Sequence, residues 1–295
     1  MRRPIIVVFF SLFLMAFQAL AAERGALFKV SDKGNTLYLY GTIHAGRADF
    51  YPLEPSIRAA MAAAPTLALE IDAARDPGAV LAAFRQHGMF AAGSPGMAAL
   101  PAERRQRIEA GLKKQGVDPA AVAQMKPWMV TTMLGLVDMR KLGYDPTLGV
   151  DAQLAQLARS SKTRIIELES VQYQAALLNR LPIEEQWRLL EETLEHMASG
   201  RQLREGRELF DAYERADQAA LDRIARRLDL DTTLTGKFMR DVVLGERNGP
   251  MADKAASLLA RENNAVVAVG LLHLLGKNGM PELLRQRGIK VERVY

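Results

Sequence analysis

Hydrophobic and polar residues alternate in short runs near the start of the chain, and this pattern predicts β-strands. Residues 27–30 and 36–40 lie on either side of an Asp-Lys-Gly-Asn turn, an order typical of a β-hairpin. Residues 66–72 alternate with a period of two, which places Glu70 and Asp72 on one face of a further strand. The first quarter of the chain is therefore expected to contribute three strands.

The rest of the chain is predicted to be mainly helical. Leu and aromatic residues recur at a spacing of three to four between residues 182 and 260, as in amphipathic helices. Residues 76–144 and 149–160 also lack a convincing strand pattern and are expected to form helices. Apolar runs predict three more strands, at residues 163–169, 265–269 and 289–294.

Strands near both termini with helices between them indicate an α/β fold. We expect a central mixed sheet built from both ends of the chain, with helical insertions. Because such a sheet needs both termini, residues 22–295 are expected to form a single domain.

The first residues have the three zones of an export signal. Arg2 and Arg3 provide a positive start, residues 5–17 are almost wholly apolar, and Ala-Leu-Ala at 19–21 fits a signal peptidase site. The apolar zone is shorter than the roughly 20 residues of a transmembrane helix. We therefore expect residues 1–21 to be a signal peptide. The mature protein is then periplasmic or secreted, with no stable membrane insertion.

Composition and charge exclude several classes of function. The net charge is +5, and basic and acidic residues are interleaved, so the one-signed stripe of a nucleic-acid-binding protein is missing. The sequence also lacks a Gly-x-Ser-x-Gly elbow, a phosphate-binding loop and a His-Glu-x-x-His helix. A serine nucleophile and a nucleotide or nucleic-acid partner are therefore not expected. The absence of Cys fits an oxidising compartment.

Two of the four histidines occupy the same sequence setting. A predicted strand runs into Gly-Thr-Ile-His at 41–44, and another runs into Gly-Leu-Leu-His at 270–273. Glycine allows a sharp turn after the strand, which aims His44 and His273 over the sheet edge where ligands bind in open α/β sheets. Each histidine could instead cap backbone groups, but the repeated motif favours a functional site.

Further motifs accompany the two histidines in a fixed order. They are Leu-Glu-Ile-Asp at 69–72, Gly-Val-Asp at 149–151, Glu-Leu-Glu-Ser at 167–170 with Gln174 behind it, and Glu-Arg-Asn at 246–248. In this combination the mature chain resembles the TraB/PrgY/GumN/TIKI family, as a bacterial GumN-like member. The resemblance implies a fold shared with erythromycin-esterase-like and ChaN-like proteins. The TIKI branch implies a protease dependent on Mn²⁺ or Co²⁺; that branch is membrane-anchored, whereas this chain has no second hydrophobic segment.

His44 and His273 with one carboxylate would form a two-histidine, one-carboxylate metal site. Such a donor set suits a divalent metal, Mn, Co or Zn, and leaves positions open for catalysis. Glu70 is the expected carboxylate, and it aligns with the glutamate that follows the first Gly-x-x-His motif in the family. Asp72 shares its strand face and is expected to orient a ligand or act as general base; a turn before Asp76 explains Asp72 equally well.

Three other residues are candidates for catalysis. Arg247 has the forked guanidinium that suits a developing oxyanion, with Asn248 beside it. The alternative is that Arg247 pairs with Glu246 at a helix end, where Asn-Gly stops the helix. Glu169 is a second candidate for the general base, although it could only cap the helix that follows it.

We therefore expect an exported, metal-dependent hydrolase that cleaves peptide bonds with metal-activated water. Two alternatives remain open. One is a metal-free, esterase-type hydrolase in which His44 or His273 is the general base. The other is a non-catalytic ligand-binding or regulatory protein of the same fold. In each case the partner is a peptide or a small molecule.

Overall fold

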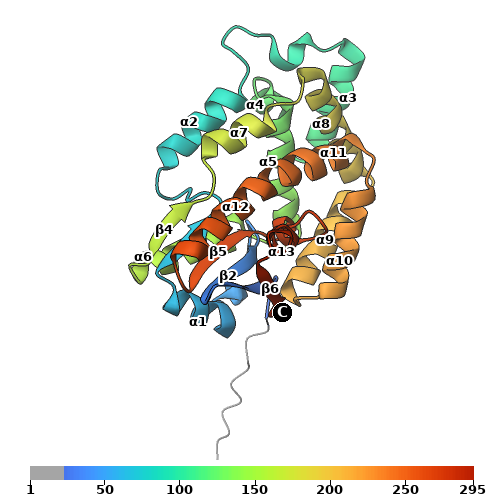
Figure 1. The fold of residues 1–295 in the computed structure, drawn as a ribbon. Coiled ribbons are helices and arrows are strands. Elements are labelled where there is room, and N and C mark those ends of the chain that lie inside the picture. Colours follow the sequence, from blue (N-terminus) through green and yellow to red (C-terminus); the bar gives the residue numbers. More distant parts are fainter. Residues whose placement is uncertain (1–22) are drawn as a thin grey trace, which may run out of the picture.

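A six-stranded mixed sheet lies in one half of the molecule, as predicted (Figure 1). The computed structural model describes residues 23–295, so the predicted signal peptide at 1–21 lies outside the described residues. The strand order is β4-β3-β5-β2-β1-β6. The strands are β1 (Leu27–Asp32), β2 (Asn35–Thr42), β3 (Thr66–Leu69), β4 (Arg164–Glu167), β5 (Ala265–Gly270) and β6 (Lys290–Arg293).

The sheet combines strands from both ends of the chain. Strands β4, β3, β5 and β2 are parallel, whereas β1 runs antiparallel to both β2 and β6. Thr42 at the end of β2 is paired with Gly270 at the end of β5. Leu69 at the end of β3 lies beside Ala268 and beside Glu167 of β4. Four carboxyl ends therefore meet at one edge of the sheet.

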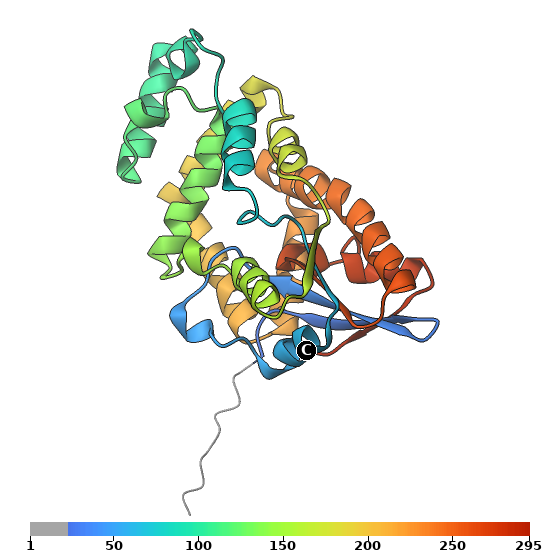
Figure 2. The ribbon, with the colours of Figure 1, turned by 90° about the vertical axis from the view of Figure 1, so that its left-hand side faces the viewer.

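Helices fill the segments between the strands. They are α1 (Pro55–Ala63), α2 (Pro77–Gly88), α3 (Ala102–Lys114), α4 (Pro119–Val122), α5 (Pro127–Lys141), α6 (Val150–Ser160), α7 (Val171–Leu178), α8 (Ile183–Ala198), α9 (Arg201–Glu214), α10 (Gln218–Leu230), α11 (Leu234–Lys237), α12 (Glu246–Arg261) and α13 (Met280–Gln286). Short 3₁₀ segments add η1 (Ala48–Phe50), η2 (Gly96–Ala99), η3 (Pro146–Leu148) and η5 (Leu271–Leu274), and η4 (Phe238–Gly245) is a π-helix. Figure 2 shows α2 to α5 standing away from the sheet.

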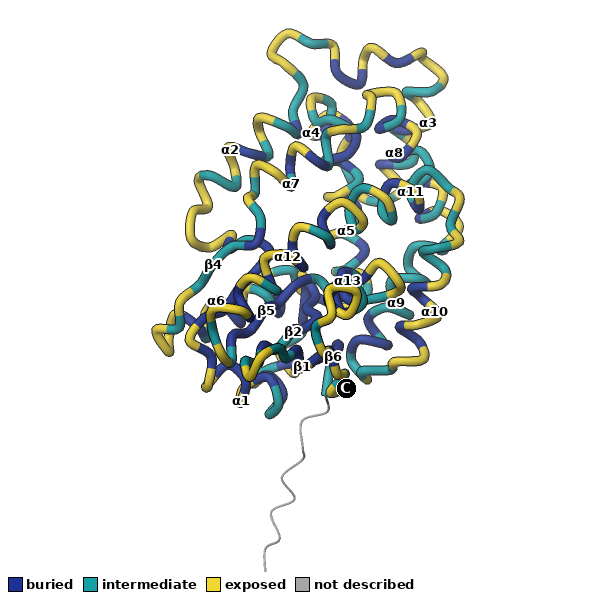
Figure 3. Tube along the Cα trace, in the orientation of Figure 1, coloured by how far each residue is buried: buried dark blue, intermediate teal, exposed yellow. Residues whose placement is uncertain are grey.

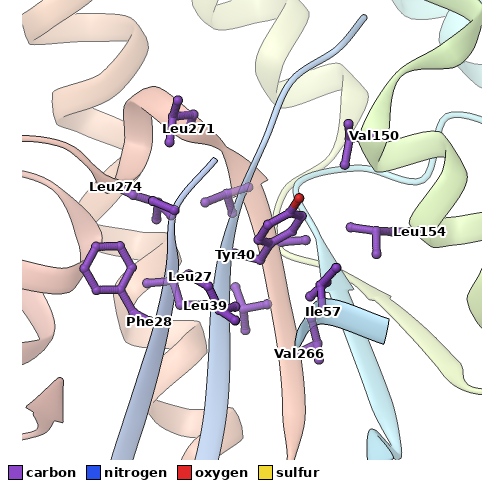
Figure 4. Close-up of a cluster of buried hydrophobic side chains, with 14 of the residues drawn as sticks. Leu27, Phe28, Leu39, Tyr40, Ile57, Val150, Leu154, Val266, Leu271 and Leu274 are labelled. Carbon is purple, nitrogen blue, oxygen red and sulfur yellow. The ribbon is translucent and has the colours of Figure 1, made fainter. Parts of the chain in front are cut away.

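Two apolar clusters hold the sheet and the helices together. The larger one surrounds the sheet, where α1 packs on β5, α6 packs on β3 and β4, and α12 packs on β1, β2 and β5. Figure 4 shows part of it, including Leu39, Ile57 and Leu154. The smaller cluster joins α3, α5 and α8 through residues such as Leu112 and Trp187. Figure 3 shows the buried residues in dark blue along the strands and along the inner sides of the helices.

The strands β3 and β4 are shorter than predicted. The strand pattern at 66–72 ends at Leu69, and the pattern at 163–169 covers Arg164–Glu167. All four residues of β3 are buried, because it lies between two parallel neighbours and is covered on both faces. The alternation therefore does not separate a core face from a solvent face. The carboxylates of Glu70 and Asp72 instead follow the end of β3, where polar partners are available.

Candidate functional site

The four parallel strand ends place two histidines and two glutamates at one edge of the sheet. His44 follows β2 by two residues, and Glu70 follows β3 directly. Glu169 follows β4 by two residues, and His273 lies in the 3₁₀ turn η5 directly after β5. Arg247, in the first turn of helix α12, completes the group. Residues 200 positions apart thus meet in one cluster, with Glu70 and Gly270 in direct contact.

Glu70 is the centre of this cluster, and only 8% of the residue is exposed. Its Oε1 accepts a hydrogen bond of 2.6 Å from the backbone N–H of Gly270. Its Oε2 accepts hydrogen bonds from the Arg247 guanidinium and, at 3.2 Å, from the Gln174 amide. These bonds compensate a charge that would be costly to bury alone.

Arg247 joins Glu70 to Glu169. Its Nε donates to the Glu169 carboxylate at 2.9 Å, and its Nη2 donates to Glu169 at 2.6 Å as well as to Glu70. Its Nη1 donates to the carbonyl of Val243 at 3.3 Å. Every nitrogen of the guanidinium therefore has a protein partner. The side chain organises two carboxylates and does not point freely at a substrate oxygen.

His273 is buried, and the hydrogen-bond network assigns its tautomer. Its Nδ1 lies 2.6 Å from Oδ1 of Asn248, whose Nδ2 donates to the Asn278 carbonyl at 2.8 Å. The Asn248 oxygen is thus the acceptor, and the proton is on Nδ1 of His273. Its Nε2 lies 3.7 Å from Oε1 of Glu70. Burial lowers the pKa of His273 to about 4, so the ring is neutral at neutral pH.

His44 is the accessible member of the cluster, with 62% of its side chain exposed. Its Nδ1 lies 2.7 Å from Oδ2 of Asp151, and the other Asp151 oxygen accepts a hydrogen bond from the Thr42 hydroxyl. The Asp151 charge raises the pKa of His44 to about 9, against the opposing effect of desolvation. The ring is thereby oriented with Nε2 turned away from Asp151.

Gly270 leaves open space between the two imidazoles and Glu70. A Cβ atom at this position would lie 3.2 Å from Glu70 Oε1, 3.6 Å from His273 Cδ2 and 3.7 Å from His44 Nε2. The three side chains therefore surround one point. A larger residue at position 270 would occupy the space that they share.

The buried part of the cluster, which excludes the exposed His44, carries an excess of negative charge. Burial raises the pKa of Glu70, but the neighbouring charges of His273, Arg247 and His44 lower it to about 2. Because His273 is neutral at neutral pH, Arg247 and His44 are the cations that act there. Glu70 and Glu169 contribute two negative charges against one positive charge on Arg247, which leaves a net charge of −1 in this buried group.

Asp72 lies outside the cluster. Its two carboxylate oxygens accept from Arg159 of α6 at 2.5 and 2.7 Å, and its backbone N–H donates to Glu167 at 2.9 Å. The shared strand face that we expected for Glu70 and Asp72 does not exist, because β3 ends before both residues. Glu70 turns towards Arg247, and Asp72 turns towards α6.

The sequence analysis assigned no role to Asp151 and Gln174, which both contact the cluster. Asp151 is placed by Gly149, where a Cβ would lie 3.0 Å from the His44 carbonyl oxygen, and by a 2.9 Å bond from the Val150 N–H to Ile43. The sequence signal for Asp151 was an acidic residue in the first turn of a helix.

The alternative in which Asn248 and Gly249 stop a helix is wrong, because α12 continues to Arg261.

The chemistry of this donor set fits a divalent metal. Each histidine uses Nδ1 for a hydrogen bond, which leaves Nε2 to bind a metal, once His44 has given up the proton on that atom; this is the arrangement usual for metal ligands. The net negative charge of the buried group and the space beside Gly270 also favour a cation. Within residues 23–295, no three His, Asp or Glu side chains stand in the arrangement of a metal site. His44, His273 and Glu70 therefore fit a metal by the kind of their donor atoms and by charge alone.

Comparison with known proteins gave matches over most of the chain. Residues 26–293 match the TraB/PrgY/gumN family. An uncharacterized protein, YbaP, of Escherichia coli (strain K12) is 27% identical over 255 residues, which cover 84% of this chain and 87% of YbaP. YbaP of Shigella flexneri matches to the same extent. No solved structure gave a significant match.

Proposed function

The chain belongs to the TraB/PrgY/gumN family, and from this membership and the cluster at the sheet edge we propose that it is a metal-dependent hydrolase. We propose peptide bonds as the substrate class, because the TIKI branch that the sequence resembles is described as proteolytic. The observation that carries the proposal is the meeting of His44, Glu70 and His273 around the space beside Gly270.

His44, His273 and Glu70 are the residues that would hold the metal, with Mn, Co and Zn as the candidates. A divalent metal supplies Lewis acidity, which polarises a carbonyl group and lowers the pKa of water. Asp151 and Asn248 hold the two imidazoles by their Nδ1 atoms, so that Nε2 of each ring is the atom available. These two residues position the ligands and need not touch the substrate.

Arg247 keeps Glu70 and Glu169 in place beside the reaction centre. The exposed ring of His44 marks the side from which a substrate reaches the cluster. Glu169 lies beside Glu70, because Arg247 Nη2 and the Gln174 amide each donate to both carboxylates. We propose Glu169 as the base that takes up a proton from the attacking water, in preference to Asp72, which is held by Arg159 outside the cluster.

Metal analysis of protein purified without chelator tests this proposal. After incubation with Mn²⁺, Co²⁺ or Zn²⁺ and removal of free metal, the wild-type chain is expected to retain about one metal ion. Glu70→Gln and His273→Ala should lose the metal and the hydrolysis of a fluorogenic peptide library together. His87→Ala, which changes a histidine of α2 outside the cluster, is the matched control and should keep both.

A metal content that is unaffected by Glu70→Gln and His273→Ala would contradict the metal site. Hydrolysis that survives complete chelation in the wild-type protein would contradict metal dependence. Circular dichroism and a melting curve for each variant separate loss of metal from loss of fold.

A metal-free hydrolase is the second candidate, and the bond of 2.7 Å between His44 and Asp151 favours it. Above its pKa of about 9, where the ring is neutral, an oriented and exposed imidazole paired with a carboxylate can act as a general base without a metal. In that case His44→Ala should abolish hydrolysis, chelation should leave it unchanged, and no metal should be retained.

We also propose export to the periplasm or the medium, on the basis of the N-terminal sequence alone. No helix among residues 23–295 is long and apolar enough to cross a membrane. Expression of the whole chain followed by cell fractionation and N-terminal sequencing tests this proposal. A mature N-terminus close to residue 22 in the periplasmic fraction is expected, whereas an intact Met1 in the membrane fraction would overturn it.

A further inference from the structure

A groove lies on the surface of the helix pair α9 and α10, and it contains no residue of the cluster. These two helices pack against each other (Figure 1), and the groove, of about 430 Å³, opens between them. Four arginines line it: Arg204, Arg207 and Arg215 from α9 and its C-terminal end, and Arg223 from α10. None of the residues of the candidate hydrolase site belongs to either helix.

The three acidic residues that line the groove are already engaged. Glu208 accepts a bond of 2.5 Å from Arg227, which lies outside the groove. Asp211 pairs with Arg215 at 3.6 Å. Asp217 caps α10 by accepting from the backbone N–H of Ala220 at 3.0 Å.

Two of the four arginines have no such engagement. Arg204 donates to the Ser199 carbonyl at 3.1 Å, and Arg215 is held by Asp211. For Arg207 and Arg223, no hydrogen bond or ion pair exists among residues 23–295. They line the same groove from opposite helices. Two forked guanidinium groups with free N–H donors thus share one hollow.

We propose that this groove binds a phosphate group, with Arg207 and Arg223 as its main donors. Guanidinium groups donate pairs of parallel hydrogen bonds to phosphate oxygens, and two of them from facing elements match a doubly charged group. The groove volume lies in the usual range for small-molecule sites and exceeds the needs of inorganic phosphate. The group is therefore expected to be part of a larger molecule, either a soluble phosphomonoester or a phospholipid headgroup.

Calorimetric titration of the mature chain with inorganic phosphate at fixed ionic strength tests the shared chemistry. A parallel flotation assay uses vesicles of phosphatidylglycerol in phosphatidylcholine, with pure phosphatidylcholine vesicles for comparison. The double variant Arg207→Gln, Arg223→Gln should weaken binding by at least about tenfold, since charge-assisted hydrogen bonds are lost. Arg226→Gln removes an exposed arginine of α10 that does not line the groove, and it is the matched control.

Saturable phosphate binding that the double variant loses, without vesicle flotation, supports a soluble phosphorylated ligand. Flotation with phosphatidylglycerol that the double variant loses supports a lipid headgroup. The proposal is overturned if neither probe binds the wild-type chain, or if the double variant and Arg226→Gln behave alike. Each substitution is on the surface, and melting curves establish that the variants are folded.

Discussion

Glu70 illustrates how one buried side chain can organise a site. An ionised carboxylate is stable inside a protein only when charges and N–H groups replace its water. Glu70 obtains these from Gly270, Gln174 and Arg247, which come from three separate segments of the chain. Removing Arg247 would leave Glu70 and Glu169 as neighbouring carboxylates without their shared cation. Arg247 is therefore needed for the integrity of the cluster as well as for any reaction there.

Gly270→Ala should damage the site without unfolding the protein. The backbone at Gly270, with φ −51° and ψ 135°, accepts any residue, but the new Cβ would lie 3.2 Å from Glu70 Oε1. We expect hydrolysis to fall by about ten- to a hundredfold, since small displacements of reacting groups have effects of this size. The measurements are peptide hydrolysis and Mn²⁺ affinity. Gly135→Ala is the control, because its Cβ would meet no atom within 4 Å.

Asp151→Asn should change the titration of His44. Asn retains the hydrogen-bond acceptor but removes the charge that raises the pKa of His44 to about 9. The pKa is therefore expected to fall towards the ordinary value of about 6.5. NMR titration of the His44 ring in metal-free protein measures this shift. Activity should fall by about ten- to a hundredfold, as for other residues that orient a metal ligand; an unchanged titration would show that Asp151 does not control the ring.

The residues of the cluster could be predicted from sequence better than their partners. Glycine before each histidine and the position of Glu70 after a strand locate three of them at the sheet edge. The contact between Asp72 and Arg159 could not be predicted, because it depends on the packing of α6 against β3 and β4. Two carboxylates separated by one residue thus acquire different partners, and no local pattern distinguishes them.

At the scale of elements, periodicity predicted which segments of the chain form strands, but it did not predict where each strand ends. The hairpin of β1 and β2 was predicted because its turn residues act locally. The ends of β3 and β4 depend on neighbouring strands, since each needs a partner for every backbone group. The π-helix η4 before α12 also had no sequence signal, and it directly precedes the helix that carries Arg247.

The segment before β1 is held by an ion pair that should make stability depend on pH. Arg24 donates at 2.7 Å to Glu54, which is 1% exposed, just before α1. Burial raises the pKa of Glu54, against the opposing effect of Arg24. A raised pKa in the folded protein means that the stability due to protonated Glu54 is present below the unfolded pKa and is lost as pH rises. Arg24→Gln removes this cation and should raise the pKa further.

We expect Arg24→Gln to lower the free energy of unfolding by about 3 kcal/mol at neutral pH, because it leaves a buried charge without its partner. The loss should be smaller in mildly acidic solution, where Glu54 is protonated in the variant. Urea denaturation at the two pH values measures both effects. Lys29→Gln, at an exposed position of β1, is the control. An equal loss at both pH values would show that the ionisation of Glu54 is not responsible.

At the scale of the whole molecule, the site depends on nearly the full length of the described chain. His44 and His273 reach the same edge only because β2 and β5 are neighbours, although about 230 residues separate them in sequence. The helical insertions contribute Asp151 and Gln174 from α6 and α7. The site therefore requires the completed sheet, and changes at the C-terminus should affect both.

Removal of residues 281–295 should abolish folding. This segment contains most of α13, which packs on α12 and on η5 with His273, and it contains β6, the partner of β1. It also forms backbone bonds between Val294 and Leu27, and between Leu27 and Tyr295, at 2.7 and 3.2 Å. Its loss would expose one edge of β1 and the buried side chains that α13 covers, so no cooperative melt is expected by circular dichroism. Removal of Tyr295 alone, which deletes one of these backbone bonds, should retain the melt, and native-like melting of the longer truncation would contradict this dependence.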